Sequence, residues 1–144
     1  MSERGFTLIE LLTAMVLMAV LAAISMKMVD ARRQAYLAVM ESDLQSIALA
    51  QEIYHANSFE LPGGPGYASN LNDLDWTPSP NITATLVAIK IGWTARVQHK
   101  LRTDFRCAVY FGDIKAMITP LEPAIQEGVI ECEPKSNKGG KTKG

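Results

Sequence analysis

Glycine and proline are both absent from Phe6 to Ala56, although the chain contains 10 glycines and 7 prolines elsewhere. These two residues are the strongest breakers of helices, and their absence removes the usual stop signals. Leucine, alanine, methionine, glutamate and glutamine dominate the stretch instead, and all of them favour helix. We therefore predict one continuous helix from Phe6 to about Ala56, which would be roughly 75 Å long at ~1.5 Å per residue.

Charge is also absent from Phe6 to Met26, with the single exception of Glu10. A stretch of this length and composition is long enough to cross a bilayer, but hydrocarbon penalises a carboxylate. Among closely packed apolar helices, the carboxylate must meet a cation or take up a proton. The segment itself contains no cation, so the compensating group must come from elsewhere.

From Lys27 onward the predicted helix becomes amphipathic. Charged and polar residues, Asp43 among them, are expected on the outer faces. The apolar residues recur at steps of three or four, which places them on one face of a helix. This stripe, which needs a packing partner, consists of Tyr36, Leu37, Met40, Leu44, Ile47, Ala48 and Tyr54.

Residues 57–80 are rich in proline, glycine and asparagine and predict a long loop. Its expected anchors to the core are Leu61, Leu71, Leu74 and Trp76. After the loop the apolar period changes to two, which predicts strands at 82–91, 93–99, 106–111 and 129–133. The sequence thus predicts an α+β fold in which a long N-terminal helix, apolar and then amphipathic, packs against a C-terminal antiparallel sheet of three to four strands.

Cysteine is scarce, with only Cys107 and Cys132 in the chain. Their spacing fits neither a CxxC redox pair nor a CxxCH haem site, so the residues favour a structural disulfide. Outside the cytoplasm, oxidising conditions would allow that bond to form. The alternative is two buried thiols in a cytosolic fold.

Sequence signals for catalysis or metal binding are few. His55 and His99 have no second ligand at metal spacing and are expected at the surface or at an interface. The loop oxygens of residues 70–75 lack the full pattern of a calcium loop. Because no nucleophile motif, phosphate loop or acid–base pair is present, we expect no enzyme activity, no metal and no cofactor.

The net charge of −1 argues against a chain that coats nucleic acid. The last residues, 135–144, carry four lysines and no acid, which predicts a solvated flexible tail. Contact of this tail with phosphate groups, as in DNA, is the alternative interpretation.

The order of a short polar leader, Gly5, Phe6, Thr7, Glu10 and a long apolar helix resembles the N-terminal signal of type IV prepilins and pseudopilins. The resemblance implies cleavage by prepilin peptidase between Gly5 and Phe6, N-methylation of Phe6, and a role for Glu10 in assembly. It also implies that Cys107 and Cys132 correspond to the disulfide that closes the C-terminal region of many pilins. The implied parts are a leader at 1–5, a transmembrane and filament-core segment at 6–26, a globular domain at 27–134 and the tail at 135–144.

The function implied by the resemblance is that of a structural subunit of a type IV pilus. Such a subunit waits in the inner membrane and then enters a helical homo-oligomeric filament at the cell surface, with help from the pilus assembly machinery. Two alternatives remain open. One is a pseudopilin of type II secretion or a minor pilin, and the other is a DNA-uptake or adhesive pilin that binds its ligand through the tail or a loop.

Overall fold

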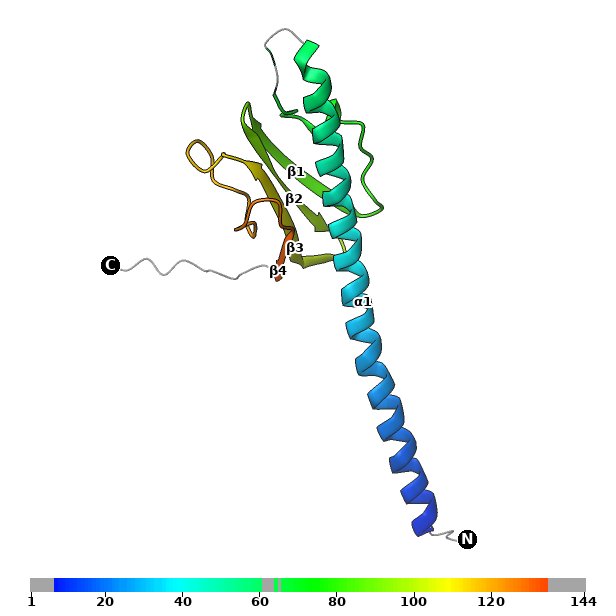
Figure 1. The fold of residues 1–144 in the computed structure, drawn as a ribbon. Helices are drawn as coiled ribbons and strands as arrows, with labels where there is room; N and C mark the ends of the chain where they lie inside the picture. The colour runs from blue at the N-terminus through cyan, green and yellow to red at the C-terminus, as the bar shows by residue number, and fades with distance from the viewer. Residues whose placement is uncertain (1–6, 61–63, 65, 135–144) are drawn as a thin grey trace, which may run out of the picture. The chain divides into compact units, whose positions relative to one another are not determined.

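One helix and one sheet make up most of the protein. The computed structural model describes residues 7–60, 64 and 66–134. Helix α1 runs from Leu8 to Asn57, followed by two short 3-10 helices, η1 (Ser58–Glu60) and η2 (Leu71–Asp73). Figure 1 shows α1 and the strands of the sheet. The chain forms two compact units that divide between Ala35 and Tyr36. The first unit is the N-terminal part of α1, and the second contains the rest of α1 and the sheet.

The single long helix confirms the prediction made from the missing helix breakers. Its bounds differ from the predicted ones by no more than two residues at each end. The helix also contains a stretch that is long and apolar enough to cross a membrane, judged by length and composition.

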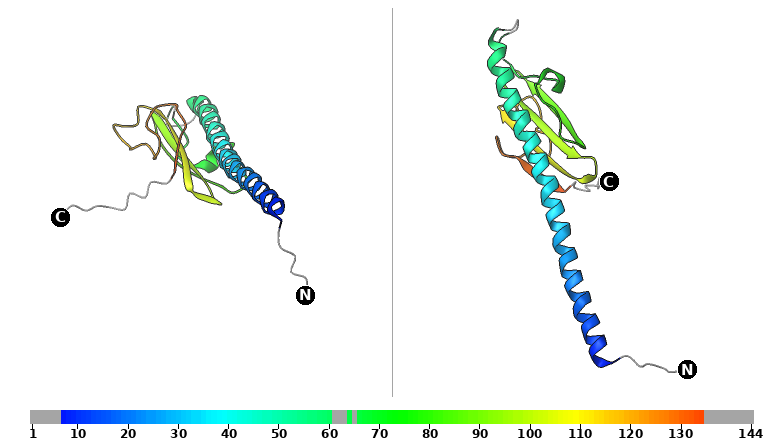
Figure 2. Two further views of the ribbon diagram at one scale, coloured as in Figure 1. Left: turned by 90° about the horizontal axis from the view of Figure 1, so that it is seen from below. Right: turned by 90° about the vertical axis from the view of Figure 1, so that its right-hand side faces the viewer.

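The sheet has four antiparallel strands in the order β1-β2-β3-β4, as the α+β prediction required. The strands are β1 (Ile82–Ile89), β2 (Gly92–His99), β3 (Arg102–Gly112) and β4 (Glu131–Pro134). β3 begins four residues earlier than predicted, because Arg102 pairs with His99 at the end of β2. The register shifts between Gln98 and His99. In Figure 2, the second part of α1 lies across one face of this sheet.

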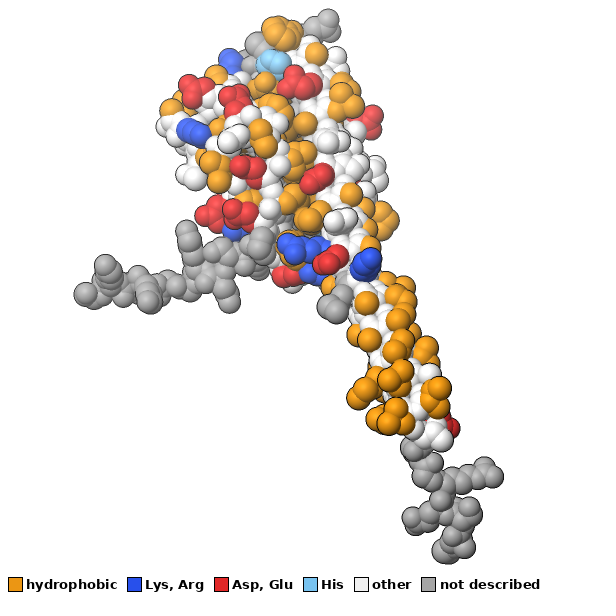
Figure 3. Space-filling model, turned by 60° about the horizontal axis from the view of Figure 1, so that its bottom comes forward, with side chains coloured by type: hydrophobic (Ala, Val, Ile, Leu, Met, Phe, Trp, Pro, Cys, Tyr) orange, Lys and Arg blue, Asp and Glu red, His pale blue; other side chains and the backbone are white. Residues whose placement is uncertain are grey.

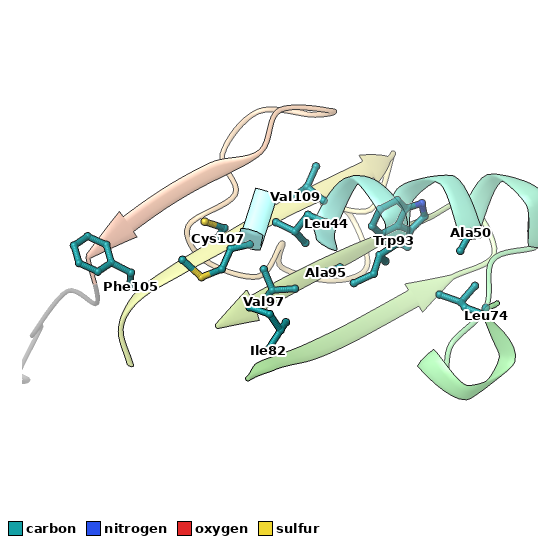
Figure 4. Packing of buried hydrophobic residues seen from close by; sticks show 13 residues of the cluster. Leu44, Ala50, Leu74, Ile82, Trp93, Ala95, Val97, Phe105, Cys107 and Val109 are labelled. Atoms are coloured by element: carbon teal, nitrogen blue, oxygen red, sulfur yellow. The ribbon is translucent and has the colours of Figure 1, made fainter. Parts of the chain in front are cut away.

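The core of the second unit lies between α1 and the sheet. Met40, Leu44 and Ile47 are fully buried, and the other members of the predicted helix stripe are at least partly buried. They pack against inward-facing residues of β2 and β3, such as Trp93 and Val109 (Figure 4). The predicted stripe is therefore the side of the helix that meets the sheet.

The opposite face of the sheet is also covered, which the sequence pattern did not predict. Ala108 and Tyr110 of β3 are buried with Ile114 and Ala124 in a second cluster on this face. The cover comes from residues 113–130, which follow β3 and lead to β4. The Thr94 hydroxyl connects the sheet to this covering segment. It donates to the Val109 carbonyl and accepts from the Leu121 N–H.

Two polar side chains of α1 hold the loop before β1. Asp43, expected on an outer face, is 4 % exposed, and its carboxylate accepts from the N–H and hydroxyl of Ser79. Gln51 is fully buried, donates to the Ala68 carbonyl at 2.8 Å and accepts from the Ala68 N–H at 3.0 Å. The prediction for Asp43 was wrong because periodicity treats every charged residue as solvated.

The predicted apolar anchors of this loop are largely confirmed. Leu74 is buried, and Leu71 and Trp76 pack against the core, whereas Leu61 lies outside the described residues. Tyr67 stacks on His55 with ring centroids 4.5 Å apart. Burial raises the pKa of the Tyr67 hydroxyl, and the carboxylates of Glu52 and Glu127 raise it further, so the ring stays neutral at physiological pH.

We predict that Gln51→Met lowers the free energy of unfolding by about 2–4 kcal/mol, because it leaves the N–H and C=O of Ala68 buried without partners. Gln45→Met is the matched control, since Gln45 is exposed, and it should change stability by less than about 0.5 kcal/mol. Denaturant unfolding of the full chain in detergent, followed by tryptophan fluorescence, measures both. Equal stability of the two variants would contradict the role assigned to Gln51.

Candidate functional site

The start of α1, from Leu8 to Ile24, exposes an almost wholly apolar surface. Its large apolar side chains are 50–82 % exposed. Figure 3 shows these side chains gathered along the helix near its N-terminus. A contiguous apolar surface of this size needs another apolar environment, such as lipid or further helices.

Glu10 is the only charged residue on this surface, and Thr7 holds its carboxylate. The N–H and the hydroxyl of Thr7 donate to Glu10 Oε2 at 2.9 and 2.8 Å. In return, the Glu10 N–H donates to the Thr7 hydroxyl oxygen at 3.4 Å. Because α1 begins at Leu8, Thr7 is the N-cap residue and Glu10 is the third residue of the helix. This reciprocal arrangement is a capping box.

The capping role of Thr7 was not predicted from the sequence, although the signal was present. Thr7 and Glu10 have the Thr-x-x-Glu spacing that precedes many helices. The capping box fixes where α1 begins and gives the carboxylate two hydrogen bonds. It does not neutralise the charge, since both donors are neutral groups. Gly5 and Phe6, the predicted processing residues, lie outside the described residues.

The second feature is the C-terminal region closed by a disulfide. Cys107 on β3 and Cys132 on β4 are direct partners in the strand register, and a disulfide joins them, as predicted. Cys107 is fully buried beneath α1, so the bond also belongs to the core. The disulfide therefore fixes both ends of the segment that covers the outer face of the sheet.

Several hydrogen bonds hold this segment between the two cysteines. The Gly128 N–H donates to the Tyr110 carbonyl at 2.9 Å, and the Gly112 N–H donates to the Glu127 carboxylate at 2.8 Å. Arg106 forms an ion pair with Glu122 at 2.8 Å, and the Ile125 N–H donates to the Glu131 carboxylate. Together with the second apolar cluster, which contains Ile114, these contacts make the segment part of the folded domain.

The described residues do not form a metal site. No three His, Cys, Asp or Glu side chains in the described part of the chain come together as metal ligands. In the loop weighed as a calcium site, the Asn70 side-chain oxygen already accepts from the Asn72 N–H and caps η2. His99 is buried beside Tyr36, with ring centroids 4.6 Å apart. The lysine-rich tail, residues 135–144, lies outside the described residues.

Comparison with protein families gives one match, which covers residues 1–26. The matching family model is described as the prokaryotic N-terminal methylation motif. This motif is typical of type IV pilins and pseudopilins, and it implies processing by prepilin peptidase. No curated protein and no solved structure matched the chain. The match agrees with the resemblance drawn from Gly5, Phe6, Thr7 and Glu10.

We predict that replacing both Cys107 and Cys132 with alanine lowers the free energy of unfolding by about 3 kcal/mol, from the chain-entropy estimate for a loop of this length. Alanine is preferred to serine because a hydroxyl at position 107 would be buried. Denaturant unfolding of the oxidised full chain and the variant measures the difference. A variant as stable as the oxidised chain would contradict a structural role for the disulfide.

Proposed function

We propose that this pilin-like chain is the structural subunit of a type IV pilus. In this proposal, prepilin peptidase cuts between Gly5 and Phe6, Phe6 is methylated, and the first part of α1 joins the core of a helical filament. The observation that carries the proposal is an exposed apolar helix with one carboxylate, within residues that match the methylation motif.

The apolar surface supports two successive environments for the helix. Before assembly it would lie in the inner membrane, since its length and composition suit a bilayer. During assembly it would exchange lipid for neighbouring copies of itself, which are equally apolar. The second unit would remain outside the cytoplasm, where oxidising conditions agree with the disulfide. The energy for extraction would come from the pilus assembly machinery.

Glu10 provides the selectivity in this proposal. On insertion scales a carboxylate costs about 2.5–3.5 kcal/mol at the centre of a bilayer and less near its edge, where Glu10 would lie. Inside a helix bundle, its negative charge needs a cation, because the Thr7 hydrogen bonds leave the charge in place. Cleavage before Phe6 would create one, the α-amino group, on the same or a neighbouring chain. Only processed chains would then pack without a buried, uncompensated charge.

The disulfide supports a pilin over the major pseudopilin of type II secretion. The C-terminal region of that pseudopilin resembles a calcium loop, whereas here the corresponding region is closed by Cys107 and Cys132. A minor pilin or pseudopilin would share the same N-terminal chemistry. The amount of this chain in sheared surface filaments distinguishes a major subunit from these minor forms.

The first prediction of this proposal concerns charge at position 10. Glu10→Gln keeps a side chain that can complete the capping box but removes the negative charge. We expect normal membrane insertion but loss of incorporation into filaments, because the α-amino group of a processed Phe6 would then be buried without a carboxylate to pair with. The amount of chain in sheared filaments measures this loss. Thr7→Val is the control that breaks the cap and keeps the charge. Normal filament yield from Glu10→Gln, or equal loss from Thr7→Val, would contradict the role given to charge.

The second prediction concerns the N-terminus of assembled chains. Mass spectrometry of shed filaments should find chains that begin at a methylated Phe6. Chains that cannot be cleaved between Gly5 and Phe6 should stay in the membrane fraction. Assembled chains that still begin at Met1 would contradict processing as the step that enables assembly.

A further inference from the structure

A groove in the second unit has no assigned occupant. It has a volume of about 490 Å³ and runs between α1 and the segment that follows η2. Figure 1 shows this segment passing alongside α1. Ala50 and Leu74 form a buried apolar floor with Trp76 beside them.

One wall of the groove is apolar and open to solvent. Leu49 and Ile53 line it from α1, and they are 63 % and 53 % exposed. The rim across from α1 carries the exposed carboxylates of Asp73 and Asp75. Neither carboxylate has a hydrogen-bond or ion-pair partner among the described residues. An occupant should therefore be apolar along most of its length and cationic where it meets the rim.

The chain itself contains a helix face with this character. Ile24, Met28 and Arg32 follow one another at steps of four on α1 and so share one face. Ile24 and Met28 are 50 % and 59 % exposed, and Arg32 is exposed as well. An arginine suits the groove because a guanidinium can pair with a carboxylate and also pack on an aromatic ring such as Trp76.

We propose that the groove receives the Ile24–Met28–Arg32 face of α1 from a second copy of this chain, with Arg32 at Asp73 and Asp75. The proposal rests on the filament proposed above and names a contact within it. If the two helices run parallel, residue 28 of one copy lies beside residue 50 of the other only when the two copies are shifted along the helix axis by about 33 Å. A Glu10 contact to residue 6 of a neighbour needs an offset of only about 6 Å. The groove would therefore bind a more distant copy than the one that meets Glu10.

Photo-crosslinking in filaments of the full chain tests this proposal. A benzophenone amino acid replaces Leu49 in the groove, and in a control it replaces Leu101, which is 67 % exposed in the turn between β2 and β3. After irradiation, we expect covalent dimers from position 49 whose partner peptide, mapped by mass spectrometry, is residues 28–32. Position 101 should not capture that peptide.

Charge reversal tests the contact at the rim. Asp75→Lys should lower the yield of the position-49 crosslink by about tenfold, because a like-charge contact replaces an opposite-charge one. Adding Arg32→Glu to the same chain should restore it. Asp113→Lys and Lys100→Glu make the same charge changes at exposed sites outside the groove and should leave the yield unchanged.

Each outcome of these experiments decides the proposal. Normal filaments with no crosslink to residues 28–32, or with one to lipid or to a different protein, would overturn the groove contact and leave the filament proposal intact. Failure of Arg32→Glu to restore the crosslink would overturn the pairing of Arg32 with the rim. If this chain forms no filaments at all, both the filament proposal and the contact that rests on it fall.

Discussion

The charge of a single carboxylate on an otherwise uncharged helix surface is the constraint on which the other features depend. Glu10 is held by Thr7 in a capping box, so the charge is hydrogen-bonded but not neutralised. A bilayer tolerates such a group near its edge far better than a bundle of apolar helices does. Assembly would therefore require a cation that only a processed N-terminus brings, which links the processing implied by the methylation motif to the apolar part of the helix.

The second unit is stabilised by apolar burial on both faces of its sheet and by hydrogen bonds that hold its long loop. Its sheet is covered on one face by the amphipathic part of α1 and on the other by the segment between Cys107 and Cys132. The hydrogen bonds of Gln51 with Ala68, and of Ser79 to the Asp43 carboxylate, attach the long loop to the helix. This gives a small domain two covered faces and leaves a groove beside α1 whose chemistry matches another part of the same helix.

The sequence predicted those features that depend on periodicity or on missing residue types. These are the long helix, its apolar stripe at Met40, Leu44 and Ile47, the antiparallel sheet and the disulfide. It did not predict Asp43 in the interior or the cover provided by residues 113–130, because both depend on partners far away in the chain. The capping box was not predicted either, although the spacing of Thr7 and Glu10 is enough to indicate it, since a cap depends only on residues close in sequence.

Solid-state NMR on mixed filaments offers the most direct measurement of the central claim. One pool of chains carries ¹⁵N-labelled phenylalanine and the other carries ¹³C-labelled glutamate, so a dipolar contact between the labels arises only between different chains. We expect a short contact between the Phe6 nitrogen and the Glu10 carboxylate carbon. A second sample of uniformly labelled chains would also report a contact within one chain. Filaments that form normally but show the contact in neither sample would contradict neutralisation of Glu10 by the new N-terminus.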